Sequence, residues 1–225
     1  MRPYAHQLRA LEFCRLRERS LIQMPAGSGK SYILRRLAVE NLRHRSVYIA
    51  CPSQEILQQH RLEALKEGML PVVDKADYVA SPHARLTIGT FQTMVNRIQK
   101  YKSSDAIALI DECHHAVNAS YQNILDYFQP RFVLGLTATP ERMDGRSIYE
   151  ICDYNVPYEI SLYEAINKGL LVPFHYYGIY DETDYGDLHL VKGHYQELDL
   201  NRKYLGNVRR YEVIRKHYQK YHSRQ

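Results

Sequence analysis

The stretch Leu21–Ser31, LIQMPAGSGKS, decides the fold of this 225-residue chain. Its apolar first half predicts a buried strand. Its glycines let backbone N–H groups curl around an anion, at the start of a helix whose positive end points the same way. The run Gly27–Ser31 contains the closing Gly-Lys-Ser of a phosphate-binding loop. The pattern departs from the full spacing at one place, since Met24 stands where a glycine is expected.

The residue types in this loop fit a nucleoside triphosphate with its metal ion. Lys30 can reach the β- and γ-phosphates as a point charge, and the Ser31 hydroxyl can hold Mg²⁺. The candidate nucleotide-binding residues of the loop are Pro25, Ala26, Gly27, Ser28, Gly29, Lys30 and Ser31.

A second stretch, Leu109–His115 with the sequence LIDECHH, supports the same interpretation. The apolar run Ala106–Ile110 predicts another buried strand. Asp111 at its end stands where P-loop NTPases place an acid that takes Mg²⁺, and Glu112 would polarise the attacking water. An isolated Asp-Glu pair is usually a solvated turn, but a turn alone leaves the strand, the upstream loop and the two histidines unexplained.

Together these motifs resemble the first RecA-like domain of a superfamily 2 helicase with a DExH-type box. Within that superfamily they resemble the branch of type III restriction translocases and excision-repair helicases. The matching motifs extend from Tyr4 to Gly145, and Cys113 replaces the usual alanine of the box without an expected consequence. The resemblance implies an ATP hydrolase that moves on nucleic acid, with ATP and Mg²⁺ as cofactors.

The resemblance also implies roles for individual residues. Gln7 falls where the family reads the adenine edge, since an amide can donate and accept at once; Tyr4 would stack on the base. The catalytic candidates are Lys30, Asp111, Glu112 and His114, and the metal candidates are Ser31 and Asp111. The candidate contacts to the nucleic-acid backbone are Pro52, Ser53, Gln54, Thr90 and Gln92.

Two threonines in the run TATP complete the set. The hydroxyls of Thr137 and Thr139 can hydrogen-bond to His114, which would couple the nucleotide site to the nucleic-acid groove. Ser53 has an alternative interpretation as a simple helix N-cap.

The order of strands and helices predicts an α/β fold, a RecA-like domain with a mostly parallel central sheet and helices on both faces. We expect this domain to span residues 1–160, with a short strand at Asp77–Ala80. Residues 161–225 are expected to lead toward a second RecA-like domain and to contain one long basic helix, Asn201–His222. The tyrosines of that helix are expected to pack on the body of the protein or on another domain, and the alternative is that they bind nucleic acid by stacking and phosphate contact.

The second domain itself is expected in a longer protein, because no further helicase motif follows Thr139. Arginine fingers from such a domain contribute ~10³–10⁵ in rate at other phosphoryl-transfer sites. We therefore expect this chain alone to bind Mg·ATP weakly and to be nearly inactive.

The net charge of +5 is unevenly distributed. Basic residues outnumber acidic ones by ten to three among residues 1–45 and by eight to one among residues 201–225, whereas acids lead by twenty-one to twelve in between. This pattern suits a polyanionic partner, although solvated helix faces also explain it.

Four dispersed cysteines indicate reduced core thiols. Without a long apolar run or a signal peptide, a cytoplasmic protein with no membrane partner is expected.

Three alternatives remain open from the sequence. One is a non-catalytic nucleic-acid-binding module whose ATP site is a relic, and the intact Lys30, Asp111 and Glu112 argue against it. The resemblance favours duplex DNA, in repair or restriction, but backbone contacts carry no base code, so an RNA helicase is an alternative. A non-helicase P-loop protein, such as a nucleotide kinase, is an alternative from another class. It would lack the motifs at Pro52–Gln54, Thr90–Gln92 and TATP, and it would need a lid over its acceptor.

Overall fold

The chain divides into two compact units, Met1–Pro173 (unit 1) and Phe174–Gln225 (unit 2). The structure is a computed structural model that describes residues 3–15, 18–74, 84–101, 106–115, 125, 127, 129–140, 148–180, 182–191 and 194–222. The division falls later than the expected boundary at residue 160. The reason is that Ile160 and Ala165 are buried in the core of unit 1, with Leu170 and Leu171 packed against it.

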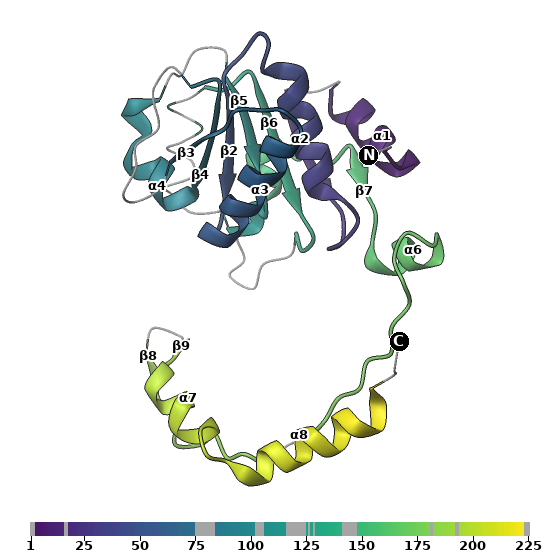
Figure 1. Cartoon of the computed structure of the whole chain (residues 1–225), viewed down its shortest axis with the longest axis vertical. Coiled ribbons are helices and arrows are strands. Elements are labelled where there is room, and N and C mark those ends of the chain that lie inside the picture. Colours follow the sequence, from purple (N-terminus) through teal and green to yellow (C-terminus); the bar gives the residue numbers. More distant parts are fainter. Residues whose placement is uncertain are drawn as a thin grey trace. The chain divides into compact units, whose positions relative to one another are not determined.

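Unit 1 is built on a seven-stranded sheet with the order β3-β4-β2-β5-β6-β1-β7 (Figure 1). Each pairing between these strands is parallel, and this confirms the predicted α/β fold with its mostly parallel sheet. The strands are β1 (Arg19–Gln23), β2 (Val47–Cys51), β3 (Val72–Asp74), β4 (Leu86–Thr90), β5 (Ile107–Ile110), β6 (Phe132–Thr137) and β7 (Tyr158–Glu159). The strand expected at Asp77–Ala80 lies outside the described residues.

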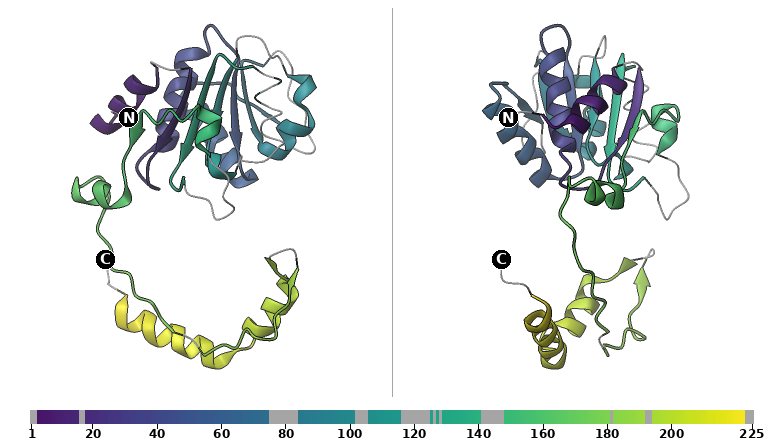
Figure 2. Two further views of the ribbon diagram at one scale, coloured as in Figure 1. Left: turned by 180° about the vertical axis from the view of Figure 1, so that it is seen from behind. Right: turned by 90° about the vertical axis from the view of Figure 1, so that its right-hand side faces the viewer.

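Both faces of the sheet are covered, as the continuous apolar strands require. Side chains alternate along β2, so that Val47, Ile49 and Cys51 enter one core layer while Tyr48 and Ala50 enter the other. Figure 2 shows helices on both sides of the sheet. The first layer lies under α1 (Ala5–Cys14), α2 (Lys30–Asn41), α3 (Gln54–Lys66) and α6 (Leu162–Asn167). The second lies under α4 (Phe91–Asn96) and the 3-10 turns η2 (Cys113–His115) and η3 (Tyr149–Cys152), with η1 (Ile98–Lys100) following α4.

Unit 2 contains a small hairpin and two helices. The hairpin pairs β8 (Leu190–Val191) with β9 (His194–Tyr195), and the helices are α7 (Glu197–Tyr204) and α8 (Val208–Tyr221). The prediction of one helix over Asn201–His222 is wrong, because Leu205 is extended and Gly206 has a φ of 80°. Asn207 then caps α8 by accepting a hydrogen bond from the Arg210 N–H at 3.0 Å. Neither helix has a buried residue.

No helix in the part of the chain that the structure describes is long and apolar enough to span a bilayer.

The four cysteines are buried in the two core layers. Cys14 and Cys51 belong to the first layer, and Cys113 and Cys152 belong to the second. Burial raises the pKa of the thiols of Cys14, Cys51 and Cys152 to about 12. Burial also raises the pKa of Cys113 well above its ordinary value, with a further contribution from neighbouring Cys152.

We therefore expect none of the four thiols to react with a thiol reagent at pH 8 while the protein is folded, and all four to react in denaturant. The thiolate is the reactive form, and a pKa higher by three units makes it about a thousandfold rarer. The same shift stabilises the folded state fully below the unfolded pKa of about 9, and the effect is lost as pH rises toward 12. Denaturant titrations at pH 8 to 11 would measure this loss of stability. Rapid labelling of the folded chain at pH 8 would contradict the expected protection of the thiols.

Candidate nucleotide and nucleic-acid site

Parallel strands bring the predicted site residues to one edge of the sheet. The strands β1, β2, β4, β5 and β6 all end there, and open α/β sheets bind ligands beyond these carboxyl ends. The P-loop follows β1, Asp111 follows β5, and Thr137 ends β6, which lies between them. The candidate nucleic-acid contacts follow β2 and β4 on the other side of β5.

Lys30 begins α2 and is only 7% exposed. Its Nζ donates to the Met24 carbonyl at 3.2 Å and lies 3.5 Å from Glu112 Oε1. The side chain of Met24 is fully buried, so this residue occupies the glycine position of the motif by facing the core. Gly29, the N-cap of α2, has a φ of 91°, and a Cβ there would lie 2.0 Å from Gln7 Nε2. Any other residue here would strain the backbone and displace the end of the Gln7 side chain.

Gln7 is attached to the P-loop. Its side chain is 4% exposed, and its Nε2 donates to the Ser28 carbonyl at 3.4 Å, while its Oε1 accepts from the Tyr4 N–H at 3.0 Å. An amide has two N–H groups and two lone pairs, so one of each is left for a base edge. The exposed ring of Tyr4 stacks on His6 with centroids 5.8 Å apart. A groove of about 560 Å³ opens here and is lined by Tyr4, Ala5, His6, Arg9, Tyr158, Lys168 and Leu170.

The acidic pair after β5 is held from several sides. Asp111 is 6% exposed, and its Oδ1 accepts from the backbone N–H of Glu112 at 3.1 Å. Glu112 adopts a left-handed φ of 48°, which is strained for a residue with a side chain. Its two carboxylate oxygens lie 3.5 Å from Lys30 Nζ and 3.4 Å from His114 Nδ1. The left-handed backbone thus sets this carboxylate between a lysine and a histidine.

The oxygen donors here fit Mg²⁺, which binds carboxylates and hydroxyls while keeping water ligands. Each oxygen of Asp111 accepts one hydrogen bond within the protein and retains a second lone pair. Ser31 is half-buried in the first turn of α2.

His114 and Thr137 lie in contact, with Nδ1 and Oγ1 3.0 Å apart. Thr137 is fully buried, and its Oγ1 also accepts from the Thr139 N–H at 3.1 Å. The structure thus brings Thr137 to His114 through its hydroxyl, while Thr139 contributes a backbone N–H and keeps its side chain exposed.

The candidate nucleic-acid contacts occupy two helix starts. Ser53 caps α3 by accepting from the Ile56 N–H at 3.4 Å, so its alternative role as a cap is present. A hydrogen bond from the Ser53 hydroxyl also lowers the pKa of Glu55. Thr90 caps α4 in the same way, through the Thr93 N–H at 3.4 Å. Pro52 is half-buried, while Gln54 and Gln92 are exposed and free of the capping role.

The sequence interpretation missed His60. This side chain is 2% exposed, and its Nε2 lies 2.8 Å from Asp111 Oδ2. Its signal was present, because His60 continues the helical spacing of the buried residues Leu57 and Ala64. A polar residue on the buried side of a helix needs a partner, but periodicity alone does not name it.

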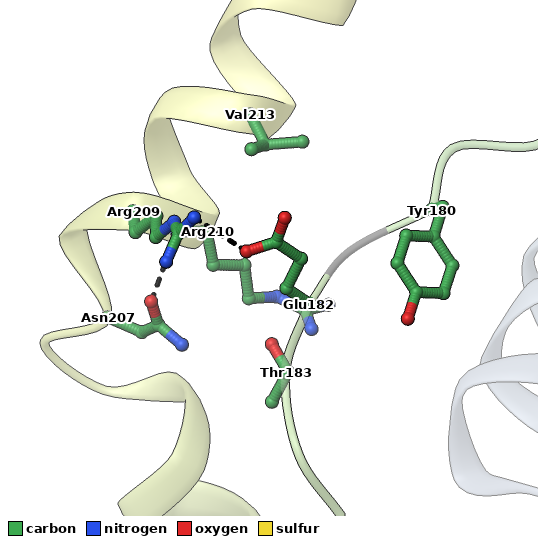
Figure 3. Close-up of a pocket in the computed structure, with 7 residues that line it drawn as sticks. All are labelled: Tyr180, Glu182, Thr183, Asn207, Arg209, Arg210 and Val213. Carbon is green, nitrogen blue, oxygen red and sulfur yellow. Dashed lines mark hydrogen bonds and ion pairs between the residues drawn. The ribbon is translucent and has the colours of Figure 1, made fainter.

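Another pocket, of about 250 Å³, lies in unit 2 and contains no predicted site residue. In Figure 3 the guanidinium of Arg209 points to Glu182, and the two side chains form an ion pair of 2.6 Å. Asn207 faces the same space and is occupied as the cap of α8. Paired charge of this kind gives no reason to assign the nucleotide to this pocket.

Residues 1–142 match the family model described as type III restriction enzyme, res subunit. The chain belongs to this family. The match confirms the restriction and repair helicase branch that the motifs indicated.

Relatives of this res-subunit family member are known from several sources. It is 31% identical over 108 residues to putative ATP-dependent helicase IRC3 of Saccharomyces cerevisiae, covering 45% of this chain and 16% of that protein. The chain is 24% identical over 166 residues to DNA 3'-5' translocase XPB2 of Sulfurisphaera tokodaii, and the match covers 72% of this chain and 37% of that protein. The chain thus spans well under half of either relative. The UvsW helicase structure of bacteriophage T4 has the same fold, with a TM-score of 0.59, 18% identity, and coverage of 72% of this chain and 60% of that one.

Gly29→Ala is expected to abolish nucleotide binding in this family member and to destabilise unit 1. Gly68→Ala is the matched control, because Gly68 also has a positive φ of 77° but open space around the new Cβ. Both substitutions carry a backbone cost of about 1–2 kcal/mol, and only the first forces Gln7 away from the P-loop. Denaturant unfolding and ATP titrations would compare them; equal effects would contradict the role of the Gln7 contact.

Proposed function

We propose that this chain is the ATP-binding domain of an ATP-dependent DNA helicase or translocase. The observation that carries the proposal is the contact of buried Lys30 with Glu112, which joins the P-loop to the acidic box at the edge where the nucleic-acid motifs also end. Family membership and the helicase and translocase relatives support it. The nucleotide kinase alternative is disfavoured by the same family match.

Each residue has a task in this proposal. The P-loop and Lys30 would bind the triphosphate, and Ser31 and Asp111 would hold Mg²⁺, whose positive charge would favour phosphoryl transfer when the ion is bound. Glu112 orients the attacking water. Lys30 Nζ lies on the same side of the loop as the box, 3.5 Å from Glu112 Oε1, which suits a role at the terminal phosphates.

Duplex DNA is the proposed track, and a second RecA-like domain of the same longer protein is the proposed partner. The relative XPB2 is named as a DNA translocase, which favours DNA over RNA. Hydroxyl and amide groups at the starts of α3 and α4 suit phosphate contacts that hold a strand without reading its sequence. The contact between Thr137 and His114 would report the nucleotide state to that groove.

Lys30→Ala is expected to abolish Mg·ATP binding in isothermal titration calorimetry. The control is Lys66→Ala, which removes an exposed lysine from the last turn of α3 and should leave binding unchanged. Hydrolysis by this chain should stay near background, because arginine fingers from a second domain contribute ~10³–10⁵ elsewhere. ATP affinity that is indifferent to Lys30 would refute the proposal.

Gln54→Glu is expected to weaken binding to duplex DNA about fivefold, since it adds a negative charge beside the phosphates. Lys66→Gln changes the net charge equally at the other end of α3 and should have less than a twofold effect. Fluorescence anisotropy with a labelled duplex at several salt concentrations would also count the phosphates engaged, from the slope. Equal losses of affinity in both variants would mean that DNA does not bind at the start of α3. Tighter binding to an RNA duplex would favour the RNA alternative.

A further inference from the structure

His60 joins α3 to the acidic box. It lies in the second turn of a helix that Ser53 caps and Gln54 begins, and its Nε2 is 2.8 Å from Asp111 Oδ2. Asp111 continues the alternation of β5 beyond Leu109, whose side chain lies in the layer under α3. The carboxylate therefore faces the helix that approaches it.

The chemistry of the pair fixes the direction of the hydrogen bond. An ionised carboxylate only accepts, so the Nε2 of His60 carries the proton and donates to Oδ2. The other oxygen, Oδ1, accepts from the Glu112 N–H at 3.1 Å. Bonds to both oxygens hold the plane of the carboxylate, and they leave one lone pair on each oxygen for a metal ion or its water ligands.

Packing alone does not explain a histidine at this position. The stripe of Leu57, His60 and Ala64 is buried, and the Nδ1 of His60 has no hydrogen-bond partner among the described residues. An unsatisfied buried polar atom destabilises a fold. A leucine would fill the same space without that disadvantage, so the contact with Asp111 is the feature that requires histidine.

We propose that His60 is a positioning residue for the Mg²⁺-binding carboxylate of Asp111, and that it couples this carboxylate to the nucleic-acid end of α3. The inference rests on the proposed function and adds to it a second connection between the two sites. The first connection runs through His114 and Thr137 on β6. The second runs through α3, because a shift of this helix on DNA binding would move His60 and with it the carboxylate of Asp111.

The test uses the whole chain with two substitutions of His60. His60→Leu fills the space without a donor, and His60→Gln keeps an N–H near the position of Nε2. ATP affinity is measured by calorimetry with Mg²⁺ and with EDTA, each with and without duplex DNA. Melting temperatures are recorded for every protein, because a purely structural role would lower them in step with binding.

We expect His60→Leu to lower the affinity for Mg·ATP about tenfold and to change ATP affinity in EDTA less than twofold. His60→Gln should recover most of the loss. The factor by which duplex DNA changes Mg·ATP affinity in the wild type should move toward one in His60→Leu, as expected for lost coupling.

Several results would overturn the inference. They are an equal loss in the Leu and Gln variants, no loss in either, or a fall in EDTA that parallels the fall with Mg²⁺. Failure of the proposed function is a different result, because the wild type would then bind no Mg·ATP or bind it independently of Lys30. Failure of the inference alone leaves wild-type binding intact and dependent on Lys30.

Discussion

Parallel pairing of the strands is the constraint on which the rest of the structure depends. A parallel neighbour can be reached only by a crossover connection, so the strands of this sheet all end at the same edge. The order β4-β2-β5-β6-β1 then fixes which loops are neighbours. The P-loop and the acidic box are separated by one strand, and that strand ends in Thr137, which contacts the histidine of the box.

Burial of charge at this edge explains why its geometry is so tightly held. Lys30 and Asp111 are 7% and 6% exposed, and a buried charge is tolerated only with close partners. The partners are the Met24 carbonyl and Glu112 for the lysine, and His60 and a backbone N–H for the aspartate. The contacts that make burial tolerable thus also orient the two side chains.

Features that depend on local chemistry could be predicted from the sequence. The glycines and Lys30 identify the P-loop because a phosphate-binding loop needs left-handed backbone and a positive charge, and residues close together in the sequence supply both. The helix break at Gly206 was missed, since the flanking residues keep helical periodicity across it. His60 could not be assigned because its partner is 51 positions away, and periodicity shows only that it faces inward. The contribution of residues 161–173 to unit 1 likewise depends on where Ala165 packs.

The hydrogen bond between Gln7 and Ser28 has a consequence for how such a site can evolve. Gln7, which the family resemblance assigns to the base, is hydrogen-bonded to the loop proposed to bind the phosphates. The absence of a side chain at Gly29 leaves room for its amide. A substitution that loosens the loop therefore also displaces the amide. Substitutions in this loop would alter nucleobase preference together with phosphate affinity.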